Sequence, residues 1–136
     1  MKIILVFAIS LISSGIKCQD TLKTPKESTD TTVFYKIDVE PQYPGGIKGW
    51  NNFLLRTLRY PEEAINNRVR GTVIVGFIID QYGKVSNVHA VSGPEGSGLR
   101  EEGERIIKKS GKWIPALLDG KYVKSYKIQP FEFSMN

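Results

Sequence analysis

The strongest constraint on the fold is an alternating segment in the middle of the chain. In Val73-Ile74-Val75-Gly76-Phe77-Ile78-Ile79, the large apolar residues at every second position share one face of an extended strand. The following loop, Asp80–Lys84, is short and contains a glycine, which is typical of a hairpin. Residues 85–91 then return as an antiparallel strand, and a slip in the alternation between Val85 and Val88 predicts a β-bulge.

Helical patterns lie on both sides of this hairpin. Apolar residues recur at helical spacing from Ile47 to Leu58, and Trp50 is expected to pack this N-terminal helix. A second helix is predicted to begin at Pro61, which is followed by two acidic residues that suit the positive end of the helix dipole. The sequence leaves open whether the region from Pro41 to Leu58 packs on the domain or folds elsewhere.

A third helix is predicted after the glycine-rich loop at residues 92–98. Its inner face carries Leu99, Gly103, Ile106 and Ser110. Gly103 weakens a helix by about 1 kcal/mol relative to Ala, so we expect it to allow close packing on the sheet. Surface pairs are expected between Glu101 and Arg105 and between Glu104 and Lys108. Trp113, just beyond the helix, is expected to be a buried core residue.

A last strand is predicted from Tyr122 to Phe133, after the turn at Asp119-Gly120. The two hairpin strands must be neighbours, so this strand adds to one side of the hairpin and lies at an edge of the sheet. Pro130 agrees with an edge position, because proline is confined to edges, strand starts and bulges. The order helix, strand, strand, helix, strand is an α+β plan.

An exposed edge strand suggests how the chain could act, because it offers unpaired N–H and C=O groups. Lys121, Lys124 and Lys127 either blunt this edge or flank a docking groove for an extended peptide. The same edge could instead pair with a second copy of the chain, giving a homodimer. Both interpretations remain open at the level of sequence.

The N-terminus has the pattern of a targeting segment. Lys2 precedes a short apolar run that drifts into small residues, and no acidic residue occurs before Asp20. We expect residues 1–18 to be a secretory signal peptide, since a spanning helix needs about 20 apolar residues. Membrane association is expected only if this segment stays uncleaved or if Cys18 is lipidated. Residues 19–37 are predicted to be a flexible lead-in, and residues 38–136 the folded domain.

Composition excludes several classes of function. The chain has 136 residues, one Cys and one His, which leaves no internal disulfide and no His-pair metal motif. His89 has no nucleophile or base beside it in any recognisable pattern, so neither an enzyme nor a cofactor or metal site is expected. Without residues 1–18, 17 basic residues remain against 14 acidic ones. This mild excess argues against nucleic acid as a partner.

An ordered set of short motifs resembles the C-terminal domain of TonB proteins over roughly residues 38–134. The Pro-Gly-Gly lead-in at residues 44–46 is similar to that of Bacteroidetes members. Two positions depart from the family, Arg100 for an acidic residue and Gly103 for alanine. The motifs are Tyr60-Pro61-Glu62-Glu63-Ala64, Gly71–Asp80, Gly83–Val88, Ser92-Gly93, Leu99–Glu102, Lys112–Pro115, Gly120-Lys121 and Pro130–Phe133.

The resemblance implies a periplasmic, non-enzymatic domain with two helices on a three-stranded antiparallel sheet, here with an extra N-terminal helix. In the family, the edge strand pairs with the TonB box of an outer-membrane TonB-dependent receptor during transport. Arg59 and Tyr60 match a second contact region, although Tyr60 could equally be a structural staple. By position, the pairing strand comprises Val123, Lys124, Ser125, Tyr126, Lys127, Ile128 and Gln129.

The short lead-in bears on whether the chain transmits force. Full TonB-like transducers have an inner-membrane helix with a coupling histidine and a long Pro-rich spacer. Residues 1–18 contain no histidine, and the lead-in contains one proline, Pro25. A flexible linker of about 20 residues averages about 25 Å end to end and stretches to ~70 Å at most. We therefore expect a soluble receptor-binding adaptor, competitor or modulator.

Overall fold

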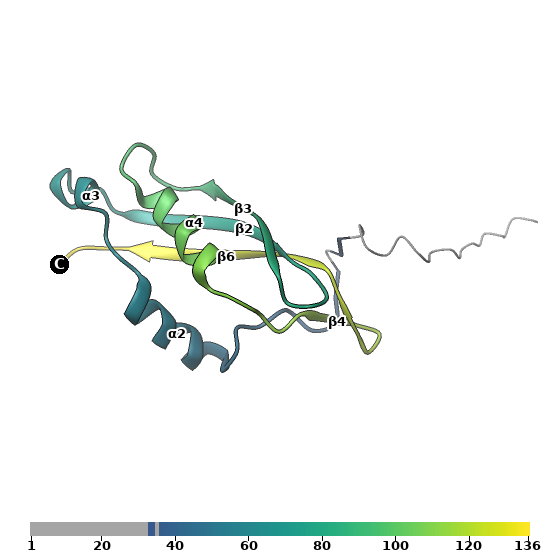
Figure 1. Ribbon diagram of the computed structural model, residues 1–136. Helices are drawn as coiled ribbons and strands as arrows, with labels where there is room; N and C mark the ends of the chain where they lie inside the picture. Colours follow the sequence, from purple (N-terminus) through teal and green to yellow (C-terminus); the bar gives the residue numbers. More distant parts are fainter. Residues whose placement is uncertain (1–32, 35) are drawn as a thin grey trace, which may run out of the picture. The chain divides into compact units, whose positions relative to one another are not determined.

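The alternating segment forms the central strand of an antiparallel sheet in the computed structural model, which describes residues 33–34 and 36–136. The three strands are β2 (Gly71–Ile79), β3 (Val85–Ser92) and β6 (Ser125–Phe133), in the order β3-β2-β6 (Figure 1). The last strand therefore lies at an edge, as predicted. Asn87 has a φ of 52°, and the β2–β3 register shifts beside it, which confirms the predicted bulge.

Among the described residues three helices accompany the sheet, and the α+β fold is confirmed. They are α2 (Gly46–Thr57), α3 (Glu62–Asn66) and α4 (Leu99–Lys109). α4 packs on the buried face of β2, and Leu99 and Ile106 are fully buried there. A Cβ on Gly103 would lie 2.9 Å from Val75 Cγ2, so the missing side chain does allow the close approach that the sequence suggested.

The end of the chain differs from the sequence prediction of one strand from Tyr122 to Phe133. Residues 121–123 instead form a separate strand, β5 (Lys121–Val123), which pairs with β4 (Ala116–Leu118). Asp119 and Gly120 close this small hairpin with φ values of 53° and 77°, as a type I′ turn requires. The strand breaks at Lys124, and β6 begins one residue later. The sequence predicts the Asp-Gly turn. The strand before the turn, β4, has only three residues, which is too short for a recognisable strand pattern.

The region from Pro41 to Leu58 packs on the domain, which resolves the alternative left open by the sequence. Phe53 of α2 is buried, and the Trp50 ring lies 5.4 Å from the Trp113 ring and 6.1 Å from the Phe131 ring of β6. Upstream of α2, Gln42 pairs in antiparallel fashion with Ile114. α2 therefore lies on the same side of the sheet as α4.

The predicted signal peptide, Cys18 and most of the predicted lead-in lie outside the described residues. Val33–Asn136 forms one compact unit. Within the described part of the chain, none of the helices has the length and apolar character needed to cross a membrane.

Candidate functional site

The β3 edge of the sheet is blunted. The N–H of Ala90 donates to the carboxylate of Glu104 on α4, with a nitrogen-to-oxygen distance of 2.8 Å. The bulge at Asn87 adds an irregular, more twisted backbone to the same strand. Both features make β3 a poor template for another strand.

The β6 edge has outward-facing backbone groups that follow from its register with β2. Pro130 lies opposite Ile74 and has no N–H, so this pair cannot be one of the hydrogen-bonded pairs of the antiparallel ladder. Hydrogen-bonded and non-bonded pairs alternate, so the backbone groups of Ile128 and Glu132 also point away from β2. The N–H of Phe34 donates to the Lys124 carbonyl over 2.9 Å, which shows the same alternation at the start of the strand.

Only part of this edge is open. Phe34 forms a parallel bridge with Ser125 and thereby covers the first residues of β6. Farther along, the Pro130 carbonyl accepts a hydrogen bond from the Gln129 side chain over 3.2 Å. Among the described residues, no backbone hydrogen bond outside the sheet ladder reaches Ile128 or Glu132. The open stretch therefore runs from Ile128 to the end of β6.

The structure divides the predicted pairing segment into parts with different surroundings. Val123 is in β5 and pairs with Ala116. Ser125 is buried opposite Ile79, and its hydroxyl has no hydrogen-bond partner among the described residues. Ile128 is half-exposed on the sheet face that the helices leave uncovered.

Successive side chains of β6 point to opposite faces of the sheet, and this separates Tyr126 from Lys127 and Gln129. Tyr126 shares the uncovered face with Ile128, and its ring stacks against His89 at a centroid distance of 6.1 Å. Lys127 and Gln129 point to the helix side, where the Lys127 ammonium lies 3.7 Å from Glu40. Lys124 lies in the break between β5 and β6.

Tyr60 and Arg59 lie at the far end of β6 and have different environments. The Tyr60 hydroxyl donates to the Val69 carbonyl over 2.6 Å, and its ring packs edge-on against Phe133 at 5.5 Å. These contacts favour the structural interpretation of Tyr60. The Arg59 N–H donates to Glu102, while the residue remains exposed.

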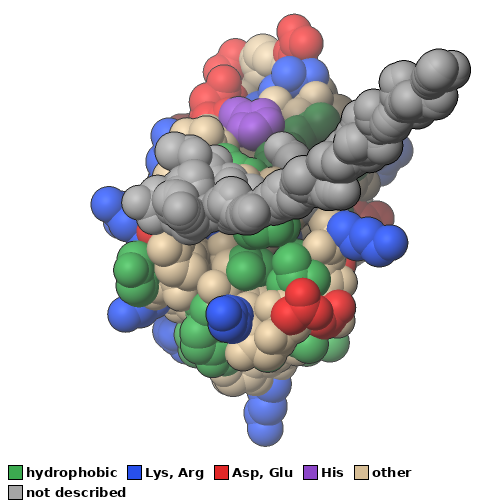
Figure 2. All heavy atoms as spheres, turned by 90° about the vertical axis from the view of Figure 1, so that its right-hand side faces the viewer, with side chains coloured by type: hydrophobic (Ala, Val, Ile, Leu, Met, Phe, Trp, Pro, Cys, Tyr) green, Lys and Arg blue, Asp and Glu red, His purple; other side chains and the backbone are tan. Residues whose placement is uncertain are grey.

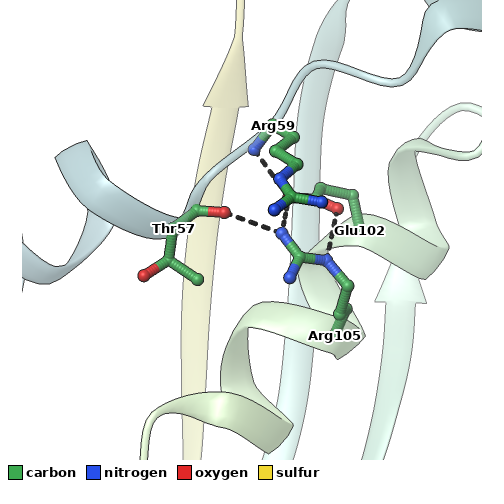
Figure 3. A network of polar contacts seen from close by, with 4 residues as sticks. All are labelled: Thr57, Arg59, Glu102 and Arg105. Carbon is green, nitrogen blue, oxygen red and sulfur yellow. Dashed lines mark hydrogen bonds and ion pairs between the residues drawn. The ribbon is translucent and has the colours of Figure 1, made fainter.

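A buried carboxylate, Glu102, links α2, Arg59 and α4 (Figure 3). Both Glu102 oxygens accept hydrogen bonds from the Arg105 guanidinium, at 2.9 and 2.7 Å. The same guanidinium donates to the Thr57 carbonyl at the end of α2 over 2.7 Å. Hydrogen bonding to Glu102 raises the pKa of Arg105 above its usual value. The sequence prediction paired Arg105 with Glu101 and Glu104 with Lys108; the structure pairs Arg105 with Glu102 instead, and Glu104 binds the Ala90 N–H.

We expect Glu102→Ala to lower the free energy of unfolding by about 2 kcal/mol. The substitution leaves the Arg59 N–H without an acceptor and Arg105 without its carboxylate partner. Urea denaturation followed by circular dichroism measures this loss. Glu101 is the adjacent exposed acid, and Glu101→Ala should change stability by about 0.5 kcal/mol or less. Equal effects of the two substitutions would contradict a structural role for the Glu102 network.

The other chemical features of the described residues do not form a catalytic constellation. His89 is exposed; its Nδ1 lies 2.9 Å from the Asn87 carbonyl, and its Nε2 lies 3.4 Å from the Tyr126 hydroxyl. Within the described ranges, no cluster of three His, Cys, Asp or Glu residues could hold a metal ion. On the face shown in Figure 2, outside the grey atoms, Lys and Arg side chains are scattered rather than gathered into one patch.

A pocket beside β6 includes residues that the sequence did not single out for binding. It has a volume of about 340 Å³, on the helix side of the sheet. Helical spacing identified Trp50 as a packing residue, but nothing marked the neighbouring Ile47, which is 81% exposed, as part of a site. The pocket is lined by Pro41, Gln42, Tyr43, Gly46, Ile47, Trp50, Trp113, Lys127 and Gln129.

The sheet therefore has one blunted edge, one partly open edge, and α2 and α4 on the same face. Residues 56–135, more than half of the chain, match the family described as Gram-negative bacterial TonB protein C-terminal, and the chain belongs to this family. The family is a non-enzymatic interaction domain of the periplasm that takes part in energy coupling for transport and interacts with outer-membrane receptors. No curated protein matches the chain.

Proposed function

We propose that this protein binds the TonB box of an outer-membrane TonB-dependent receptor by adding it to the outer edge of β6. The observation that carries the proposal is the set of outward backbone groups at Ile128 and Glu132, which a fourth strand would satisfy. Export to the periplasm by residues 1–18, and action as a receptor-binding adaptor, competitor or modulator, belong to the same proposal.

In this proposal the predicted contact residues have different roles. Ile128 supplies backbone pairing, and Tyr126, Lys127 and Gln129 flank the peptide on the two faces. Lys124 and Ser125 lie where Phe34 already covers the edge, so contact there requires Phe34 to move. Val123 lies still farther back, in β5. Arg59 offers an exposed side chain for the second contact, and Tyr60 supports the end of β6.

The direct test is Ile128→Pro. Proline at this position removes an outward donor without removing a hydrogen bond to β2, just as the native Pro130 does two residues later. We expect binding of a receptor TonB-box peptide, measured by calorimetry, to weaken at least about tenfold. That is a loss of about 1.4 kcal/mol, within the range of one or two hydrogen bonds.

Ile128→Ala is the matched control, because it shortens the side chain and keeps the N–H. It should retain most of the affinity, and thermal unfolding should show that both variants are folded. Proline at Ser125 or Lys127 would be uninformative, since those backbone groups face β2. A folded Ile128→Pro variant that binds the peptide as tightly as the unmodified protein would refute capture at this edge.

The same open edge supports a second candidate function, pairing with the β6 of another copy. Two such strands could add to each other around a twofold axis and form a dimer. Sedimentation equilibrium over a wide concentration range tests this directly. A dimer that Ile128→Pro dissociates would support self-association, whereas a monomer at all concentrations would exclude it.

A further inference from the structure

The pocket beside β6 adjoins the open edge. Its apolar walls are the rings of Tyr43, Trp50 and Trp113, together with the side chain of Ile47 on the first turn of α2. Lys127 and Gln129 complete it from β6 itself. The pocket therefore lies directly below the part of the strand that flanks Ile128, on the helix side of the sheet.

Strand geometry relates this pocket to a captured peptide. Successive side chains of a strand point to opposite faces, and residues directly opposite each other on neighbouring strands share a face. Lys127 and Gln129 point to the helix side. A peptide residue paired with either of them therefore also points to the helix side, over the pocket, while its two neighbours point to the uncovered face.

The lining indicates which side chain fits. Aromatic and aliphatic side chains line the pocket beside the polar groups of Gln42, Lys127 and Gln129. The volume of about 340 Å³ is at the lower end for ligand pockets, which suits one or two large side chains. Lys127 is the one charged group among the lining residues, and Glu40 already lies 3.7 Å from its ammonium. An uncharged apolar group would meet no unpaired charge there, and it would cover the exposed Ile47.

We propose that this is a specificity pocket, which selects peptides carrying a large aliphatic or aromatic side chain at the position paired with Lys127 or Gln129. The inference rests on the proposed strand capture and adds a sequence preference to it. Tyr43, Ile47 and Trp50 precede residues 56–135, the part that matches the family. The pocket therefore combines residues from before the matched region with Trp113, Lys127 and Gln129 from within it.

Intrinsic fluorescence reports on this pocket, because both tryptophans of the chain, Trp50 and Trp113, line it. The probe is a receptor TonB-box peptide free of Trp and Tyr, with each residue replaced in turn by Ser. We expect Ser at one apolar position, or at two positions spaced by two, to weaken binding about tenfold and to remove most of the fluorescence change. Uniform small losses at every position would overturn the proposal.

The matched protein variants are Ile47→Gln and Leu55→Gln. Both side chains lie on α2 and are exposed, at 81% and 84%, but only Ile47 lines the pocket. Ile47→Gln should weaken the original peptide about fivefold and leave the affinity of the pocket-position Ser peptide unchanged, since the contact is already lost there. Leu55→Gln should affect neither peptide.

The outcomes separate the two proposals. If Ile128→Pro abolishes binding but Ile47→Gln behaves like Leu55→Gln, the pocket preference is wrong and strand capture stands. If Ile128→Pro leaves binding intact, strand capture fails, and the pocket proposal fails with it even where Ile47→Gln weakens the peptide.

Discussion

Trp113→Ala is expected to lower the free energy of unfolding by about 3–5 kcal/mol, the usual cost of removing a buried Trp. The side chain is 3% exposed, and its ring lies 5.4 Å from each of the rings of Tyr43, Trp50 and Phe77. The segment just before α2, α2 itself and the central strand therefore lose a shared contact at once. Urea denaturation followed by far-ultraviolet circular dichroism measures the change.

Ser110→Ala is the control for the polar part of this effect. The Trp113 Nε1–H donates to the Ser110 hydroxyl over 2.8 Å, and the hydroxyl in turn donates to the Ile107 carbonyl. Removing these bonds without the ring should cost about 1 kcal/mol. If Trp113→Ala costs no more than Ser110→Ala, the aromatic cluster does not join α2 to the sheet energetically.

Gly83→Ala should also be strongly destabilising, by about 3 kcal/mol. Gly83 has a φ of 91°, and a Cβ there would lie 2.2 Å from the Trp113 carbonyl oxygen. The native contact is a hydrogen bond from the Trp113 N–H to the Gly83 carbonyl, over 3.0 Å, which holds the β2–β3 turn against the segment after α4. Alanine therefore adds a backbone clash to the strain of positive φ.

Gly120→Ala separates the clash from the strain. Gly120 has a φ of 77°, but a Cβ there would meet nothing within 4 Å. Gly120→Ala should therefore lower the free energy of unfolding by about 1 kcal/mol, the cost of the left-handed conformation alone. The difference in unfolding free energy between the two variants measures the contact, and a difference near zero would show that the turn can move away from Trp113.

The sheet could be predicted from sequence because its signals are local. The alternation in β2, the short loop after it and the slip at Asn87 each act within a few residues. The hairpin leaves only an edge for β6, and Pro130 agrees with that position, since a proline cannot donate to a neighbouring strand. The three-stranded antiparallel sheet that the family resemblance implies is confirmed.

The remaining features depend on contacts between distant residues. Arg105 pairs with Glu102 rather than Glu101 because Glu102 faces inward, towards the Arg59 N–H and the end of α2. Helical spacing brings both Glu101 and Glu102 within reach of Arg105, but it gives no information on which residues of other elements contact the helix. The hairpin of β4 and β5 likewise depends on pairing that a three-residue strand does not reveal.

The candidate site was predictable in kind but not in extent. The residue pattern predicts the edge strand, and the family resemblance implies that residues 123–129 are its pairing segment. The Phe34 bridge at Ser125 moves the open part towards Ile128 and Glu132, and this bridge joins residues that are 91 positions apart. The pocket was not foreseen, because it forms only where α2, the segment after α4 and β6 meet.

The most direct test of the central claim is an amide exchange measurement by NMR on the isotope-labelled protein with and without a receptor TonB-box peptide. Strand capture predicts that the outward N–H groups of Ile128 and Glu132 shift and become protected from exchange when the peptide binds. Ala90, on the blunted β3 edge, should be unaffected. Saturable binding that leaves both β6 amides unprotected, or that protects the β3 edge instead, would contradict the account.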